Sequence, residues 1–419
     1  MKILISWHRI PDVEVHTTIR IKNIVEELKK STNVEIIWLI CMPEPLIDIP
    51  NFGKDVKILD IHNYENAIDV LKKEKPDLIF GSSSYNLISY SLAVAGKFLN
   101  IPILSDFSQK RSSDKLSASN IKLFFEKSVS TDDQTTKKFM RRGRFLVYKF
   151  LFVLKTQIAR KMNPFLIIKF CFILFKHHLF YEELPMDVRF ANDIHWVSDE
   201  SLFSDLIQHG FDPKTLFVTG DPYFDQDFKK INLSTRKKLN GKIRVLFAPS
   251  TNYEHGLCSK SEQNNAILSI LRSLSKNKKF ELIFKIHPSS ANLSDYEKLV
   301  ASIDPDIKIY QTGNIIDYIE TTDIIIVFPA GFISINALIA KIPIIIFNFY
   351  NDKNDIFLEK NLAFECHSES ELPNLIELSI KKPISEDKIN NFLSSFYYKT
   401  DGLSSKRVAT VILNFLKIS

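Results

Sequence analysis

The sequence predicts an α/β protein of two domains, each a parallel sheet covered by helices, which face each other across a cleft. Two observations predict this class. The chain has 419 residues, which is too long for one ordinary core and fits two domains of about 200 residues each. Short apolar runs alternate along it with helical patterns of roughly ten residues, as expected for parallel strands joined by crossover helices.

The first domain is predicted over residues 1–195. Its strand signals are Lys2–Trp7, Val34–Cys41, Val56–Asp60, Asp77–Gly81 and Ile101–Leu104. The helical patterns between them are Thr18–Lys30, Glu65–Glu74 and Leu87–Leu99. Continuous apolar strands of this kind are typical of a sheet that is covered on both faces.

The second domain is predicted over residues 196–400 and alternates more regularly. Its strand signals are Lys242–Pro249, Phe280–His287, Ile307–Thr312, Asp323–Phe328, Ile342–Asn348 and Ala363–His367. This order indicates a second Rossmann-like unit. Residues 401–419 are predicted to be a C-terminal helix that crosses back to the first domain.

Several classes of protein are disfavoured by the residues present. The four cysteines are scattered, so they predict neither a disulfide framework nor a zinc site, and they favour a reducing compartment. The N-terminal residues lack the long apolar core of a signal peptide, and we expect a cytoplasmic protein. Neither a GxGxxG motif nor a P-loop occurs, which argues against NAD-type and ATPase functions.

The loops after the strands of the second domain carry the residues expected to bind phosphate. In open parallel sheets the ligand binds beyond the carboxyl ends of the strands. Small and hydroxyl residues there expose backbone N–H groups at helix N-termini, which attract phosphate. The candidates for donor binding are Gly220, Ser250, Thr251, Lys285, His287, Pro288, Ser289, Gly313, Pro329, Ala330 and Gly331.

Four segments resemble glycosyltransferases of the two-Rossmann (GT-B) architecture. Ser201–Asp225 resembles the segment before their second domain, and Lys285–Pro288 resembles the Lys-x-His-Pro element of bacterial polymer transferases. These include capsule polysaccharide transferases, CDP-glycerol glycerophosphotransferases and some sialyltransferases. Asp317–Phe347 resembles their donor-site helix, and Asp401–Arg407 is similar to their "D-G-x-x-x-x-R" turn. The resemblance covers roughly residues 195–415 and fades in the first domain.

This resemblance adds Ser334 and Asn336 to the donor-binding candidates. Related proteins often have Glu in this helix to hold the ribose hydroxyls, whereas Asn336 brings no charge. The chain is also similar to UDP-GlcNAc 2-epimerase-like proteins. However, Pro329-Ala330-Gly331 stands where their "D-S-G-G" signature is found.

A catalytic base is expected from the first domain, because an inverting transferase must accept the proton of the acceptor hydroxyl. Asp106, after the strand Ile101–Leu104, is the first candidate, and His8 is the second. Either residue could equally be a solvated loop residue. The carboxylates Asp225 and Asp227 are interpreted as solvated surface, and we expect no cofactor and no obligatory metal.

The net charge of +6 comes from one segment. Eleven Lys and Arg and no acidic residue lie between Gln134 and Tyr181. Residues 137–181 combine these cations with short apolar runs, too short for the roughly 20 residues of a membrane span. Such a segment is typical of a helix lying in an anionic membrane interface. The candidates for membrane binding are Arg141, Arg142, Arg144 and Lys149. The alternatives are a buried helix pair with outward lysine stems, and nucleic acid, which the large aliphatic content disfavours.

The sequence thus predicts an inverting, metal-independent glycosyltransferase on the cytoplasmic face of a membrane. It would transfer a sugar from a nucleotide-sugar donor to a surface glycan or lipid-linked acceptor. Three alternatives stay open: a CDP-alcohol phosphotransferase of the glycerol-phosphate type, a non-hydrolysing UDP-sugar 2-epimerase, and a two-domain binding protein without activity.

Overall fold

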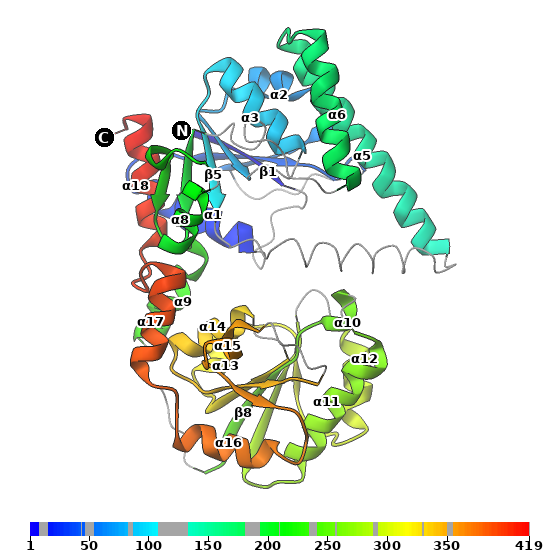
Figure 1. Ribbon diagram of the computed structural model, residues 1–419, viewed down its shortest axis with the longest axis vertical. Coiled ribbons are helices and arrows are strands. Elements are labelled where there is room, and N and C mark those ends of the chain that lie inside the picture. Colours follow the sequence, from blue (N-terminus) through cyan, green and yellow to red (C-terminus); the bar gives the residue numbers. More distant parts are fainter. Residues whose placement is uncertain are drawn as a thin grey trace. The chain divides into compact units, whose positions relative to one another are not determined.

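The computed structural model describes residues 1–7, 16–42, 44–46, 54–82, 87–107, 133–180, 193–208, 210–233, 241–255, 258–287, 292–328, 331–349 and 355–418. The chain divides into two compact units (Figure 1). The first contains Met1–Asp225 and Ser395–Ser419, and the second contains Gln226–Ser394. The units therefore divide after Asp225 and after Ser394, whereas the sequence analysis placed the boundaries after residues 195 and 400.

The first unit is built on a seven-stranded parallel sheet with the order β3-β2-β1-β4-β5-β6-β7. Five strands correspond to predicted ones, whereas the short strands β6 and β7 were not predicted. The strands are β1 (Lys2–Trp7), β2 (Glu35–Ile40), β3 (Val56–Asp60), β4 (Leu78–Ser82), β5 (Ile103–Phe107), β6 (Ile194–Val197) and β7 (Leu216–Val218).

Helices cover both faces of this sheet, which explains why its strands are apolar almost throughout. On one face α18 packs against α1, and their side chains form a common core with the strands. On the other face α2 and α3 pack with α5. The helices are α1 (His16–Leu28), α2 (Ala67–Glu74), α3 (Leu87–Leu99), α5 (Asp133–Ala159), α6 (Pro164–Phe180), α8 (Glu200–Gln208) and α18 (Ser404–Leu416).

The second unit has a six-stranded parallel sheet with the order β10-β9-β8-β11-β12-β13. The strand order reverses between β8 and β11, which is the point where open α/β sheets bind their ligands. All six predicted strands are present. They are β8 (Ile243–Ala248), β9 (Phe280–Lys285), β10 (Ile309–Tyr310), β11 (Ile324–Val327), β12 (Ile344–Phe347) and β13 (Phe364–Cys366).

The helices of the second unit follow the same alternation. They are α10 (Asn252–His255), α11 (Lys260–Ser275), α12 (Leu293–Ala301), α13 (Ile315–Ile319), α14 (Phe332–Ile339), α15 (Ile356–Glu359) and α16 (Leu372–Lys381). Two further helices, α9 (Asp225–Leu233) and α17 (Glu386–Tyr397), carry the chain across the boundary between the units.

Three phenylalanine rings anchor the carboxyl ends of the central strands of this sheet. The rings of Phe247 and Phe284 stack with centroids 5.0 Å apart, and Phe328 meets Phe247 edge-on at 5.7 Å. All three side chains are fully buried. Packing of this density holds side chains in single conformations, so the loops that follow these strands start from a rigid base.

Candidate active site

The sequence-predicted residues of the second unit gather where the strand order of its sheet reverses. Ser250 and Thr251 follow β8, His287 follows β9, and Gly331 precedes α14 after β11. Because parallel strands end at the same edge of a sheet, these loops share the carboxyl edge of the unit. Pro288, Ser289, Pro329 and Ala330 lie outside the described residues, as does His8 of the first unit.

The loop after β8 is held in place by α11. Thr251 and Asn252 are buried. The backbone N–H of Tyr253 donates to Gln263 Oε1 at 2.9 Å, and Gln263 in turn donates to Tyr296 Oη at 3.0 Å. The loop conformation is therefore fixed by buried side chains. Such a preformed backbone is what a phosphate-binding loop requires.

Lys285 and Gln311 tie the ends of β9 and β10 together. Lys285 is 6% exposed, and its ammonium donates to the backbone carbonyls of Gln311, at 2.7 Å, and Ile286, at 3.3 Å. Gln311 Nε2 donates to the carbonyl of His287 at 3.5 Å. His287 itself is exposed. The sequence analysis named Lys285 as a candidate for donor binding. In this structure it crosslinks the strand ends and leaves His287 as the exposed member of the motif.

The two loop glycines differ in what their positions demand. Gly313 has φ +92°, and a Cβ there would lie 3.0 Å from Tyr318 Oη, so this position favours glycine. Gly331 is extended, and its added Cβ would meet no atom of the described residues within 4 Å. Its N–H donates to Oγ of the buried Ser334 at 3.3 Å. Ser334 thus caps the start of α14, and Gly331 leaves open space beside it.

Asn336 and Asp227 form a polar pair between α14 and α9. Asn336 is 2% exposed, and its side chain bonds to the carboxylate of Asp227. Burial raises the pKa of Asp227 to about 6. The hydrogen bond from Asn336 and the nearby charge of Lys230 both oppose this rise. Among the described residues, Asn336 Oδ1 has no hydrogen-bond partner. An unpaired buried carbonyl costs about 1–3 kcal/mol, which a ligand hydroxyl would recover.

Asp227 is a candidate site residue that the sequence analysis missed, because Asp225 and Asp227 were both interpreted as solvated surface. That interpretation was wrong. Asp225 is 1% exposed and accepts bonds from the backbone N–H groups of Ser404, at 2.9 Å, and Ser405, at 2.6 Å. It therefore caps the N-terminus of α18. The apolar residues that follow Asp227 at helical spacing were the available signal that this stretch is a helix and not a turn.

The remaining predicted residues lie in the first unit. Asp106 is the fourth residue of β5 and pairs in register with Ser82 and Trp196. It therefore lies within the strand, whereas the sequence analysis placed it after the strand's end. Gly220 has φ +84°, and a Cβ there would lie 2.5 Å from Ser404 Oγ. Packing against α18 thus accounts for Gly220 without a ligand.

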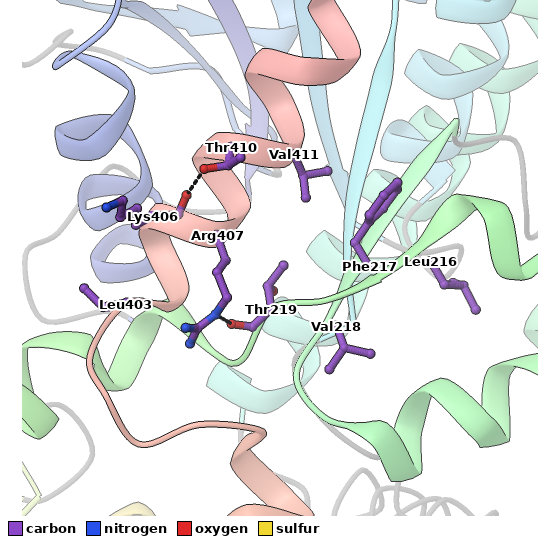
Figure 2. A pocket seen from close by; sticks show the side chains of 9 residues that line it. All are labelled: Leu216, Phe217, Val218, Thr219, Leu403, Lys406, Arg407, Thr410 and Val411. Carbon is purple, nitrogen blue, oxygen red and sulfur yellow. Dashed lines mark hydrogen bonds between the residues drawn. The ribbon is translucent and has the colours of Figure 1, made fainter.

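The "D-G-x-x-x-x-R" segment also has a structural role. Arg407 donates to both carboxylate oxygens of Asp401, at 2.9 and 3.0 Å, and its Nε donates to the carbonyl of Thr219 at 2.7 Å. Figure 2 shows this side chain reaching from α18 to the end of β7. It lies in a cavity of about 560 Å³ between β7 and α18. None of the sequence-predicted site residues that the structure describes lines this cavity.

The predicted membrane-binding residues all lie in α5. Arg141, Arg142 and Arg144 are part of the helix, but their side chains are outside the described ones. Lys149 is half-buried with its ammonium 4.6 Å from the centre of the Phe145 ring, and burial lowers the pKa of Lys149. Lys149 thus packs in part against the protein.

Within the part of the chain that the structure describes, no group of three or more His, Cys, Asp and Glu side chains is arranged to hold a metal ion. Within the same residues, none of the helices combines the length and the apolar character needed to cross a bilayer. The four cysteines are free thiols.

No protein-family model matches the sequence, and no curated protein matches it. Its structure, however, is similar to solved nucleotide-sugar enzymes over the whole chain. The Neisseria meningitidis UDP-GlcNAc 2-epimerase bound to UDP-GlcNAc is 14% identical, with 99% of this chain and 100% of that chain covered and a TM-score of 0.55. The Methanocaldococcus jannaschii UDP-GlcNAc 2-epimerase is 16% identical, with the same coverage and a TM-score of 0.56.

A glycosyltransferase is similar to the chain as well. The glycotransferase of kitacinnamycin is 10% identical, with 99% of this chain and 98% of that chain covered and a TM-score of 0.53. The chain therefore has the two-domain GT-B-like fold that the sequence predicted, and it shares this fold with UDP-GlcNAc 2-epimerases and a glycosyltransferase.

Proposed function

We propose that this protein is an enzyme that acts on a nucleotide-linked sugar, with the nucleotide bound at the carboxyl ends of β8 and β11. The observation that carries the proposal is the Asn336–Asp227 pair beside the reversal in strand order of the second sheet. Asn336 Oδ1 is buried and has no partner among the described residues. It can accept a bond from a ribose hydroxyl.

Asp227 supplies the charge that Asn336 lacks. A carboxylate that is already bonded to the Asn336 amide holds that amide so that its oxygen is free for the ligand. The nucleotide diphosphate would then be bound by backbone N–H groups of the loop at Ser250 and Thr251, beside the open space that Gly331 leaves. His287 would donate to the phosphates from the end of β9. These donors would stabilise a leaving diphosphate without an obligatory metal.

Within this class we favour epimerisation of a UDP-sugar at C2. The structural neighbours named above include two UDP-GlcNAc 2-epimerases, one of them bound to UDP-GlcNAc. The second candidate is transfer of the sugar to a glycan or lipid-linked acceptor. It is favoured by the exposed basic and apolar surface of α5 and α6, since an epimerase needs no acceptor and no membrane. Asp106 remains our first-unit candidate for proton transfer.

Calorimetric titration with UDP, GDP, CDP and CMP tests the nucleotide site. We expect UDP to bind, and Asn336→Ala to weaken it by about tenfold, the loss of roughly one hydrogen bond to a neutral group. Thr322→Val is the matched control, because Thr322 is buried at the opposite end of β11 and its hydroxyl bonds to the Tyr318 carbonyl at 2.7 Å. It should bind UDP normally.

Proton NMR of UDP-GlcNAc incubated with the protein, with EDTA present, tests the reaction. Inversion at C2 without an acceptor supports the epimerase. Release of UDP only when a glycan or lipid-linked acceptor is added supports the transferase. A folded protein that binds none of the four nucleotides would rule out the whole proposal.

A further inference from the structure

The helices α5 and α6 present an unusual number of exposed apolar side chains. Eight of the fourteen large apolar side chains that are exposed in the described part of the chain belong to these two helices. Exposed apolar patches of this kind mark interaction sites. We define the α5–α6 surface by its most exposed members, which are Val147, Leu151 and Ile158 of α5 and Phe165, Ile168 and Phe172 of α6.

Each helix has one packed stripe and one exposed stripe. In α5, Phe145 and Phe152 are buried in the core that includes α2 and α3. In α6, Phe170 is buried and stacks on Tyr90 of α3 with ring centroids 5.2 Å apart. Figure 1 shows both helices beside α2 and α3 at the edge of the first unit.

The exposed stripes follow helical spacing on the opposite side. Val147, Leu151 and Ile158 recur every four and seven residues, and they are 58%, 49% and 58% exposed. Phe165, Ile168 and Phe172 recur at three and four residues, and they are 82%, 69% and 60% exposed. These residues are therefore not the core face of either helix.

The cations on this surface have no acidic partner within the described residues. Lys155 lies in α5, Lys169 in α6, and Lys161 between them, and all three are exposed. No acidic residue occurs anywhere from Gln134 to Tyr181, whereas eleven Lys and Arg do. The surface therefore combines apolar side chains with uncompensated positive charge.

We propose that the α5–α6 surface docks the protein on an anionic lipid bilayer, with Phe165, Ile168 and Phe172 entering the interface and the lysines meeting lipid phosphates. This chemistry suits a lipid surface because an interfacial helix needs both features. A second copy fits poorly, since a symmetric interface would bring the exposed Lys155, Lys161 and Lys169 of both copies together with no acidic residue between them. Nucleic acid would leave the aliphatic side chains in water.

Sedimentation with lipid vesicles tests this docking directly. We expect the full-length protein to bind vesicles of phosphatidylcholine mixed with phosphatidylglycerol at least tenfold more tightly than vesicles of phosphatidylcholine alone. Rising salt should weaken the binding, because lipid charge is screened. Phe165→Ser with Phe172→Ser should reduce binding at least tenfold. Lys155→Gln with Lys169→Gln should reduce it roughly 30-fold.

Two matched controls lie in the second unit. Leu378→Ser removes a side chain that is 44% exposed, and Lys278→Gln with Lys308→Gln removes two exposed lysines. Both controls should bind vesicles like the parent protein. Equal binding of the α5–α6 variants and the parent would overturn the proposal. So would a parent protein that ignores anionic vesicles, or one that forms a dimer which the phenylalanine variants dissociate.

UDP titration of the same variants separates this inference from the proposed function. The α5–α6 variants should bind UDP like the parent, because their substitutions lie in the first unit, whereas β8 and β11 belong to the second. The two proposals can therefore be told apart: vesicle binding without UDP binding supports only the docking, and UDP binding without vesicle binding supports only the proposed function.

Discussion

Arg20 in α1 donates through Nε and Nη2 to the two carboxylate oxygens of Asp221, at 2.7 Å each. The side chains of both partners are almost fully buried, with 6% and 2% exposed. One turn further along α1, Asn23 donates to the carbonyl of Pro222 at 2.8 Å. Two hundred residues of sequence separate these partners, so the pair fixes α1 to the chain that leaves β7.

Removing one partner of this pair should be costly. We expect Arg20→Ala to lower the free energy of unfolding by about 3–5 kcal/mol, because Asp221 is left as a buried, uncompensated charge. The double variant Arg20→Met with Asp221→Asn should recover most of that loss. Urea unfolding of the single and double variants measures both effects. A loss of less than about 1 kcal/mol in Arg20→Ala would show that the pair is not buried in solution.

Asp227→Asn should stabilise the protein while weakening nucleotide binding. Burial raises the pKa of Asp227 from 3.8 to about 6. The unfolded carboxyl therefore ionises before the folded one, and stability falls as pH rises from about 4 to 6. Asn cannot ionise, so we expect a gain on the order of 1 kcal/mol at pH 7 that shrinks towards pH 4.

Thermal unfolding across this pH range, with and without UDP, tests both parts. Asp317→Asn is the control, since Asp317 lies on α13, is exposed and forms an ion pair with Lys230 of α9. Unchanged UDP affinity in Asp227→Asn would remove this residue from the proposed site, and unchanged stability would contradict its burial.

His195 should make the first unit sensitive to acid. Its side chain is 2% exposed and bonds through Nδ1 with the Ser105 hydroxyl. Burial, aided by Lys97, lowers the pKa of His195 from 6.5 to about 4. The unfolded imidazole takes up a proton first, so stability is lost as pH falls from about 6.5 to 4, up to about 3 kcal/mol.

Urea unfolding of the parent and of His195→Gln between pH 4 and 7.5 checks this effect. We expect a weaker pH dependence below 6.5 in the variant. His367→Gln is the control because that histidine is half exposed, and it should retain the parent profile. Parallel curves for the parent and His195→Gln would be evidence against a neutral, buried imidazole.

Two glycine substitutions should separate packing from ligand binding. Gly220→Ala requires a left-handed alanine and displaces Ser404, so we expect a loss of about 1–3 kcal/mol. The backbone at Gly331 is extended, and an added Cβ would meet open space among the described residues. Gly331→Ala should therefore change the free energy of unfolding by no more than about 1 kcal/mol. It should nevertheless weaken UDP binding, because its Cβ blocks close approach of a phosphate to the backbone. Calorimetric titration and thermal unfolding distinguish the two cases.

The sequence predicted the fold well because the strands are long apolar runs. The runs at Ile324–Val327 and Ile344–Phe347 are apolar throughout, and both are buried strands in the structure. By contrast, the run Ile194–Val197 is interrupted by His195 and Leu216–Val218 has only three residues, so neither stood out, and the domain boundary was placed after residue 195, inside the first of them. Their strand character comes from pairing with β5 and with each other.

The candidate site was predicted only in part, for a similar reason. Strand ends carrying Ser, Thr, His and Gly are visible in a single sequence, which is how Ser250, Thr251, His287 and Gly331 became candidates. The roles of Lys285 and Gly220 were not visible, because they depend on a carbonyl at Gln311 and a hydroxyl at Ser404.

The sequence by itself therefore determined the α/β class, the order of the elements and the basic, apolar segment, since these depend on local pattern and composition. Only the tertiary structure decided which polar groups are buried together, such as Arg20 with Asp221 and Asp227 with Asn336. Burial and its effect on pKa arise from neighbours that are distant in sequence. No local pattern contains that information.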